Sequence, residues 1–332
     1  MNEWLQSRLV CPRDKEPLKF SENRLTCPRG HVYPVFEDIP VMLVDDAEIT
    51  HDYINRTLEK IAGARSAPAE NQNPPNGSDK NEIDAFVQGE VPYTSGNLYF
   101  SVQHKLTRYP IPECRLPVGR GERLLDIGCN WGRWSIAAAR KGYRPIGLDP
   151  SLDAVLAARR VSRQLGIETD FLVGDARFLP FADDSFDAVF SYGVFQHFSK
   201  ENVRTSLDEV VRVLKPNGKT LFQMPNKYGI RQYQQHRRRG FTEGEGFEVR
   251  YWTPAELIET FERRFGATEM TTDCYFGLGI QASDVDLLPL HYKMVVYSSE
   301  LLRKISGVIK PLTKVADSVY LESENRKKSE TK

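Results

Sequence analysis

Hydrophobic and polar positions follow two alternating periods from residue 122 onward. Short apolar runs typical of buried strands are separated by stretches with apolar residues at helical spacing. The expected strands cover residues 123–127, 144–148, 169–173, 186–191 and 219–223, and the expected helices cover residues 133–141, 152–165 and 202–214. Strands that alternate with helices form a parallel sheet covered on both faces. We therefore expect an α/β fold with a doubly wound, mostly parallel sheet.

The regions before this pattern differ from it in composition. Residues 1–45 hold short apolar runs and two tight turns, and we expect a small β-rich ribbon there. Residues 46–82 begin as a helix. Residues 64–82 carry almost no large apolar side chain, so burial of apolar surface there cannot offset the conformational entropy that is lost on folding. This part is predicted to be a disordered linker. Aromatic residues and prolines in 83–120 indicate short helices and loops that form a lid.

The regions after the last expected strand are an insertion, a helix and a tail. Residues 225–250 form an insertion, rich in arginine and glycine, within a domain spanning residues 121–285. Thr253, Pro254 and Glu256 predict the start of a helix, with Thr as N-cap and Glu completing a capping box. Residues 286–332 carry apolar residues at helical spacing as far as Val319, which predicts amphipathic C-terminal helices and a fraying basic tail.

Composition narrows the class of protein. The chain has 332 residues, 40% of them hydrophobic, so it can bury a sizeable core. The number of Lys plus Arg residues equals the number of Asp plus Glu residues, at 45 each. The protein therefore has no net positive charge that would attract it to nucleic acid or to an acidic membrane. The sequence begins without a secretory signal pattern, and no run reaches the roughly 18 apolar residues of a membrane span, so we expect a cytoplasmic protein. Five scattered cysteines argue against a disulfide framework.

The turn after the first expected strand carries the strongest chemical signal. Residues 126–132 read Asp-Ile-Gly-Cys-Asn-Trp-Gly, and the second expected strand ends at Asp149. Small residues at this turn let a backbone approach a nucleoside, and the later carboxylate can accept both ribose hydroxyls. A dinucleotide site needs a third glycine, which is missing here. Asp126 would disfavour a pyrophosphate but would suit a sulfonium.

Ordered segments across 121–225 add to this turn. They are Gly147-Leu148-Asp149, Gly174-Asp175-Ala176, Phe186-Asp187-Ala188-Val189, Gln196-His197-Phe198 and Arg212-Val213-Leu214-Lys215-Pro216-Asn217-Gly218. In this order they resemble the class I S-adenosylmethionine-dependent methyltransferases of the type 11 subgroup, with a Rossmann-like sheet. The resemblance implies a cofactor site, in which Gly128, Asn130 and Gly132 hold the methionine part, with Asp126 nearby. Asp149 takes the ribose, Asp175 and Ala176 border the adenine, and Ser191 and Tyr192 face the methionine moiety.

Candidates for chemistry and acceptor binding lie after the fourth expected strand and in the insertion. His197 is a candidate general base, or a residue that shapes the pocket at a helix start. Methyl transfer is an in-line displacement in which alignment can supply much of the acceleration, so a base is not always needed. Tyr228, Arg231 and Arg250 are candidate acceptor-binding residues, and the arginines favour an anionic acceptor. A solvated basic loop paired with its own glutamates is the alternative.

Cys11, Asp14, Cys27 and His31 are candidate metal ligands in the first 45 residues. The two turns resemble the zinc knuckles of some rRNA guanine methyltransferases, and residues 33–43 resemble small zinc-ribbon activators of tRNA and protein methyltransferases. Structural zinc usually takes four N or S ligands, and Asp14 supplies oxygen instead. The alternatives are a structural zinc site and a ribbon that has lost its metal.

The leading hypothesis is S-adenosylmethionine-dependent methyl transfer to a small-molecule or lipid-linked acceptor. An RNA methyltransferase that uses the ribbon and the loop 231–239 to grip phosphates is a second hypothesis, and a non-catalytic partner protein of the same fold is a third. The C-terminal helices either touch a membrane surface or pack their apolar stripe on the core. The sequence leaves the acceptor atom and the oligomeric state open.

Overall fold

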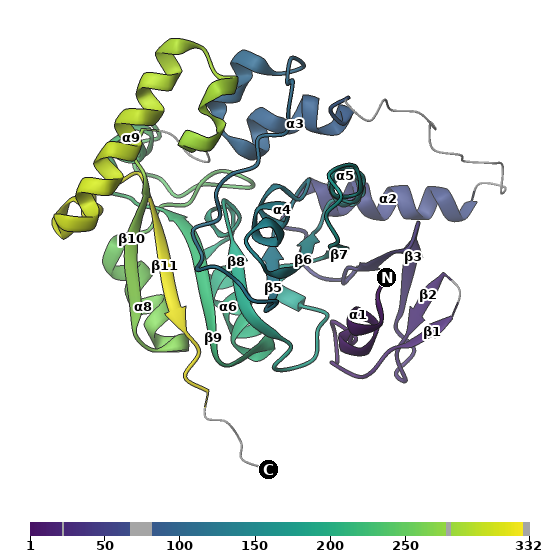
Figure 1. Cartoon of the computed structure of the whole chain (residues 1–332). Helices are drawn as coiled ribbons and strands as arrows, with labels where there is room; N and C mark the ends of the chain where they lie inside the picture. The colour runs from purple at the N-terminus through teal and green to yellow at the C-terminus, as the bar shows by residue number, and fades with distance from the viewer. Residues whose placement is uncertain (22, 67–81, 277–279, 328–332) are drawn as a thin grey trace.

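The protein is an α/β fold built on one long twisted sheet (Figure 1). The computed structural model describes residues 1–21, 23–66, 82–276 and 280–327. Within these residues the strands lie in the order β1-β2-β3-β4-β7-β6-β5-β8-β9-β11-β10. From β4 to β9 neighbouring strands are parallel, and β11 is antiparallel to both β9 and β10. The expectation of a doubly wound, mostly parallel sheet is confirmed.

The strands agree closely with the hydrophobic pattern in the core of the sheet. Their bounds are β1 Lys19–Ser21, β2 Arg24–Thr26, β3 Val32–Phe36, β4 Ile39–Met42, β5 Arg123–Ile127, β6 Arg144–Asp149, β7 Asp170–Gly174, β8 Phe186–Ser191, β9 Leu214–Pro225, β10 Thr268–Cys274 and β11 Ser318–Glu324. The chain runs outward from β5 through β6 to β7 and then returns to β8 on the other side of β5. This reversal places a switch point at the carboxyl ends of the central strands, where open α/β sheets bind ligands.

Helices cover both faces of the sheet. The α-helices are α1 Glu3–Arg8, α2 Asp52–Ser66, α3 Ala85–Ser95, α4 Arg133–Arg140, α5 Leu152–Gln164, α6 Lys200–Val213, α7 Ile230–Arg238, α8 Pro254–Phe265 and α9 Leu290–Val308. The short 3-10 helices are η1 Asn97–Val102, η2 Ala176–Phe178, η3 Phe195–His197, η4 Ala282–Leu287 and η5 Lys310–Val315. On one face α6 and α8 pack on the sheet through Leu207 and Phe261, and on the other α4 and α5 pack through Trp134 and Val155.

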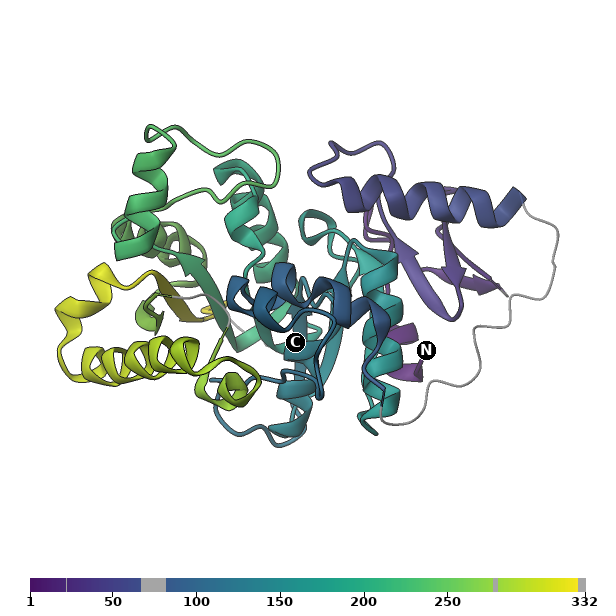
Figure 2. The ribbon, with the colours of Figure 1, turned by 90° about the horizontal axis from the view of Figure 1, so that it is seen from above.

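The N-terminal ribbon is joined to the main sheet. Val41 and Met42 of β4 pair in parallel with Val173 and Gly174 of β7, so the small strands extend the sheet at that edge. Leu5, Leu9 and Cys11 belong to the same apolar cluster as the central strands. Figure 2 shows the ribbon and α2 together at one end of the molecule. The predicted linker falls mainly on residues 67–81, which lie outside the described residues.

The C-terminal region departs from the helical prediction. Residues 290–308 form α9, but residues 318–324 form β11, which inserts between β9 and β10. The prediction of helix through Val319 is wrong because apolar spacing along the sequence does not reveal that β9 and β10 leave a gap for another strand. Asn325, expected in a fraying tail, is buried, and its amide donates to the carbonyl of Leu214 (2.9 Å).

The boundary between α6 and β9 also differs from the prediction. The helix ends at Val213 and the strand begins at Leu214, five residues before the expected start. The breaker residues Pro216 and Gly218 therefore lie within β9. The strand accommodates them at a register irregularity opposite Phe186 and Ala188.

Candidate active site

A cavity of about 410 Å³ opens at the carboxyl ends of the central strands. Its walls come from the strand ends, from the segment 92–98 at the end of α3, and from the segment 50–54 at the start of α2. The predicted site residues that line it are Gly128, Asn130, Asp149, Asp175, Ala176, Tyr192, His197 and Arg231. Eight candidates from separate parts of the sequence therefore meet in one cavity.

Asp149 is a buried carboxylate at the end of β6. It accepts hydrogen bonds from the backbone N–H groups of Asn130 (3.0 Å) and Ser151 (2.9 Å). No lysine, arginine or histidine of the described residues forms an ion pair with it. Burial therefore dominates and raises the pKa of Asp149 to about 6. A ligand whose hydroxyl groups donate hydrogen bonds to this carboxylate would replace the hydrogen bonds with water that the carboxylate loses on burial.

The turn 128–132 adopts the backbone that its composition predicted. Gly128 has a φ of +75°, and a Cβ there would lie 2.1 Å from a methyl carbon of Val194. Asn130 has a φ of +46°, a conformation that Asn tolerates better than most residues. Gly132 starts α4 with a φ of +82° but does not line the cavity. A Cβ at Gly132 would lie 3.1 Å from Ala158 and Phe171, so packing also demands this glycine.

Asp126 lies beneath the cavity and not in its wall, which corrects the expectation that it faces the ligand. Its side chain is buried and accepts a hydrogen bond from the hydroxyl of Ser135 (2.6 Å). Burial raises its pKa to about 7, so near neutral pH it carries only part of a negative charge. Because Asp126 is bonded to Ser135 and does not line the cavity, its carboxylate does not contact a ligand there.

Asp175 and Ala176 follow β7 and line the cavity beside Asp149. The Asp175 carboxylate accepts from the Arg177 guanidinium (2.7 Å) and from the Arg177 backbone N–H (2.8 Å). Arg177 also donates to the carbonyl of Glu48 (2.6 Å), in the segment that leads to α2. Asp175 is thus held in place by an internal ion pair at the predicted adenine border.

Ser191 and Tyr192 have different positions at the end of β8. The Ser191 hydroxyl is buried and donates to the carbonyl of Ile127 (3.0 Å), so it ties β8 to β5 and does not line the cavity. Tyr192 lines the cavity, and its hydroxyl donates to Asp273 (2.7 Å). Burial raises the pKa of Tyr192 well above its ordinary value, so this hydroxyl stays protonated.

His197 lines the cavity, but both of its ring nitrogens are occupied. Nδ1 lies 2.6 Å from the carbonyl of Phe247, which requires a proton on Nδ1, and Nε2 lies 3.0 Å from the amide nitrogen of Gln196. The ring stacks on Phe247 with centroids 3.8 Å apart. Burial lowers its pKa to about 4. These contacts describe a neutral ring that shapes the wall.

The three candidate acceptor residues are not brought together. Arg231 lines the cavity and donates to the carbonyl of Phe276. Arg250 lies outside the cavity wall, and its guanidinium donates to the carbonyls of His197 (2.5 Å) and Gly246 (3.0 Å). Tyr228 is half exposed at 52% and also lies outside. The arginines thus bind backbone carbonyls, which removes the main argument for an anionic acceptor.

Two buried glutamines were missed by the sequence analysis. Gln196 and Gln232 line the cavity with exposed fractions of 8% and 4%. The side-chain oxygen of each has no hydrogen-bond partner in the described structure. Gln196 follows β8 and Gln232 lies in α7, within the insertion 225–250, where the sequence singled out the arginines and not a glutamine. Two unpaired buried acceptors in one cavity favour a ligand that donates hydrogen bonds.

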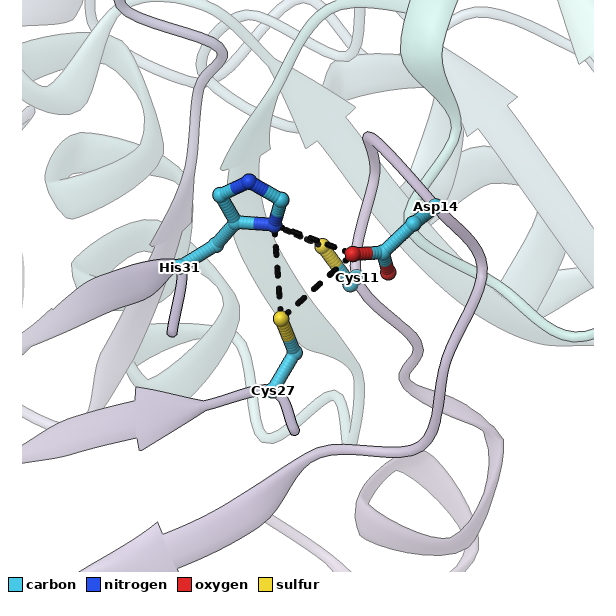
Figure 3. A group of neighbouring side chains, drawn as sticks. All are labelled: Cys11, Asp14, Cys27 and His31. Carbon is cyan, nitrogen blue, oxygen red and sulfur yellow. Dashed lines mark hydrogen bonds and ion pairs between the residues drawn. The ribbon is translucent and has the colours of Figure 1, made fainter. Parts of the chain in front are cut away.

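The four candidate metal ligands lie together in the ribbon (Figure 3). Their ligand atoms are all within 4.8 Å of one another. This cluster is separate from the cavity at the strand ends.

Comparison with known proteins finds similarity in the central part of the chain. Residues 124–218 match a family model described as a methyltransferase domain. This match supports a class I methyltransferase. A stretch of 110 residues is 37% identical to the Bacillus subtilis (strain 168) protein named uncharacterized methyltransferase YcgJ, covering 33% of this chain and 41% of that protein. A 140-residue stretch is 38% identical to demethylmenaquinone methyltransferase of Clavibacter sepedonicus, covering 40% of this chain and 54% of that protein.

A third relative is fatty-acid O-methyltransferase of Mycolicibacterium smegmatis, 38% identical over 105 residues, 31% of this chain and 36% of that protein. The chain thus spans only about a third to a half of the length of these relatives. Among solved structures, Bacillus subtilis YcgJ aligns with a TM-score of 0.43 and 22% identity over 63% of this chain and 93% of that one. The sheet order and the family match over residues 124–218 describe a Rossmann-like methyltransferase fold.

Proposed function

We propose that the protein transfers a methyl group from S-adenosylmethionine to a small-molecule or lipid-linked acceptor. The observation that carries the proposal is the cavity itself, which gathers the glycine turn, Asp149 and Asp175 at the switch point of the sheet. The methyltransferase match over residues 124–218 covers the same strand ends.

The residues present fit the methyl donor. Asp149 is a buried carboxylate that lacks a cationic partner within the described residues, and ribose hydroxyls would satisfy it. Asn130 and Gly128 border the space next to Asp149, where the methionine part would lie, and Ala176 borders the other side, where the adenine would lie. When bound, the donor supplies an electrophilic methyl group on a sulfonium.

The acceptor is a neutral group that donates a hydrogen bond. Gln196 and Gln232 line the cavity, and each has a buried amide oxygen without a hydrogen-bond partner in the described structure, so a hydroxyl or N–H of the acceptor that reached these oxygens would satisfy them. His197 and Tyr192 form part of the same wall, and burial lowers the pKa of His197 and raises the pKa of Tyr192, which favours the neutral form of each. We assign His197 the task of orienting Phe247 and Gln196, since its own nitrogens are engaged. Catalysis then comes from alignment and the exclusion of water.

The surface of α9 favours the lipid-linked class of acceptor. Its exposed apolar residues fall on a single stripe, made of Leu290, Met294, Tyr297, Leu301, Ile305 and Val308. The buried side of the same helix carries Val296, Ser299 and Ser306, so the stripe faces solvent rather than the core. Lys293 and Lys304 border the stripe, which suits an anionic lipid surface.

The described helices include none long and apolar enough to cross a membrane. Contact through α9 would therefore lie in the plane of the lipid surface. On its buried face, α9 contributes Val296 to the same apolar cluster as Val91 and Tyr99. These two residues flank the segment 92–98 that lines the cavity. A helix on the lipid surface would thus stand next to the wall of the cavity.

Binding of the methyl donor tests the proposal. Isothermal titration of the full chain with S-adenosylhomocysteine should give one site per chain, weakened about tenfold or more by Asp149→Asn, which corresponds to roughly 1.4 kcal/mol. The matched control is Asp153→Asn in the first turn of α5, whose side chain is 55% exposed and pairs with Lys60. A folded wild type that does not bind this ligand would favour a non-catalytic partner protein instead.

A further inference from the structure

The four ligand atoms in the ribbon lie within 4.8 Å of one another, and four of their six mutual distances are close to those of a tetrahedral metal site (Figure 3). The Nδ1 atom of His31 lies 3.0 Å from an Asp14 oxygen, 3.3 Å from Cys27 Sγ and 3.5 Å from Cys11 Sγ. Cys27 Sγ lies 3.5 Å from the same Asp14 oxygen. Tetrahedral zinc with bonds of about 2.0 to 2.3 Å places its ligand atoms roughly 3.3 to 3.8 Å apart.

The surroundings of the cluster also suit a cation. The side chain of Asp14 is only 8% exposed, and its nearest arginine, Arg29, is at 4.0 Å and largely exposed. Cys11 and Cys27 are buried. A divalent ion would replace the two thiol protons and satisfy the buried carboxylate and the imidazole together. All four positions are filled by protein atoms, which is typical of structural rather than catalytic zinc.

The ligands come from two pieces of chain that are attached to different parts of the molecule. The loop with Cys11 and Asp14 is docked on the main domain, because Val10 N–H donates to the Pro180 carbonyl (3.0 Å) and Lys15 pairs with Glu209 of α6 (2.7 Å). Cys27 and His31 belong to the turn between β2 and β3. An ion at the cluster would therefore fasten the ribbon hairpin to the main domain.

The ribbon leads directly into one wall of the cavity. The chain passes from β3 to β4, which pairs with β7 just before Asp175, and then to Thr50, His51 and Tyr53, which line the cavity. Thr57 of α2 accepts from the N–H of Leu152 (3.0 Å) and donates to the Pro150 carbonyl (2.9 Å), immediately after Asp149. The hairpin and this wall are thus consecutive along the chain and are joined through β4.

We propose that Cys11, Asp14, Cys27 and His31 bind one structural Zn²⁺ that fixes the ribbon and thereby orders residues 43–54 at the cavity wall. The site would be formed in the folded chain without taking part in methyl transfer. Its effect on the methyl donor would come through the position of Thr50, His51 and Tyr53 and rests on the proposed function, whereas metal binding and ordering do not.

Elemental analysis, cobalt substitution and hydrogen exchange test the metal site. Purified full chain should hold one zinc per molecule, and Co²⁺ put in its place should give the absorption of a tetrahedral site with thiolate ligands. Asp14→Asn, which preserves side-chain size, should lose the metal and increase amide hydrogen exchange in residues 43–54 by about tenfold. Cys114→Ser, which removes a buried thiol elsewhere, is the control and should retain both properties.

Binding of S-adenosylhomocysteine separates this inference from the proposed function. Removal of zinc by a chelator should weaken binding about tenfold, and added zinc should restore it. A folded wild type that stays metal-free when incubated with zinc would overturn the metal site. Unchanged exchange in residues 43–54 after zinc removal would overturn its structural role. A zinc-loaded, ordered protein that fails to bind the ligand would contradict only the proposed function.

Discussion

At the scale of single residues, Asp149 is the residue on which the proposed binding of the methyl donor depends most. Burial raises its pKa from 3.8 to about 6, so the folded protein binds this proton more tightly than the unfolded chain does. The contribution of this carboxyl to stability therefore decreases as the pH rises from about 4 to about 6. The ionised form is the better acceptor for ribose hydroxyls, so ligand binding should change in the opposite direction.

We predict that affinity for S-adenosylhomocysteine rises about tenfold between pH 5 and pH 7 in the wild type. Titration calorimetry at several pH values measures this. Asp126 titrates in an overlapping range, with a pKa of about 7, but it lies beneath the cavity. The Asp149→Asn variant keeps Asp126 and should lose most of the pH dependence. An equal pH dependence in this variant would show that Asp149 is not the group responsible.

Gln232 offers a test in which stability and activity change in opposite directions. Its unpaired buried oxygen costs about 1 to 3 kcal/mol in the free protein. Gln232→Met should raise the melting temperature by a few degrees and raise the KM for the acceptor at least tenfold. Gln234→Met, on the exposed side of the same helix, is the control. A variant that is more stable and equally active would remove Gln232 from the acceptor site.

The sequence correctly placed several residues at the strand ends that line the cavity. It could not predict which side chains near those strand ends point into the cavity and which are buried between elements. Gly128, Asn130, Asp149, Asp175 and Ala176 are in the cavity because parallel strands end at one edge of the sheet. Asp126 and Ser191 adjoin the same strand ends but are buried between elements. Gln232 could not be predicted, because its burial depends on where α7 lies.

At the scale of elements, α9 has an amphipathic pattern with an unexpected orientation. The spacing of apolar residues predicted a helix, but it could not indicate which side faces the core. The core side of α9 carries two serines, and the Ser306 hydroxyl donates to Thr272 (2.8 Å), while the apolar stripe is exposed. Packing on the core, the alternative weighed for the C-terminal apolar residues, holds for Leu302 and Val319 but not for the exposed stripe of α9.

We predict that the full chain sediments with vesicles containing anionic lipid and binds vesicles of neutral lipid more weakly. Met294→Ser with Leu301→Ser should reduce binding about tenfold or more, because each side chain loses roughly 1.5 to 3 kcal/mol of apolar burial. Tyr228→Ser, which also removes an exposed large side chain, is the control. Loss of a dimer in these variants, with no effect on vesicles, would assign the stripe to a second copy of the chain.

At the scale of the whole molecule, the sequence predicted the central sheet but not how its edges are completed. The ribbon extends one edge through β4 and β7, and the C-terminal strand β11 completes the other between β9 and β10. The pairings of β4 with β7 and of β9 with β11 link residues more than 90 positions apart, and local periodicity carries no information about such pairs. The consequence is that residues 50–54, which follow the ribbon, form part of the cavity wall.

Incubation with S-adenosylmethionine labelled in its methyl group, in the presence of fractionated cell extract, tests the central claim most directly. We expect the wild type to transfer label to the lipid or small-molecule fraction and Asp149→Asn to transfer at least tenfold less. Label in the RNA fraction would replace the proposed acceptor with RNA. If the wild type binds the donor and labels no fraction above the level of a heat-inactivated control, the claim that this protein is a methyltransferase is contradicted.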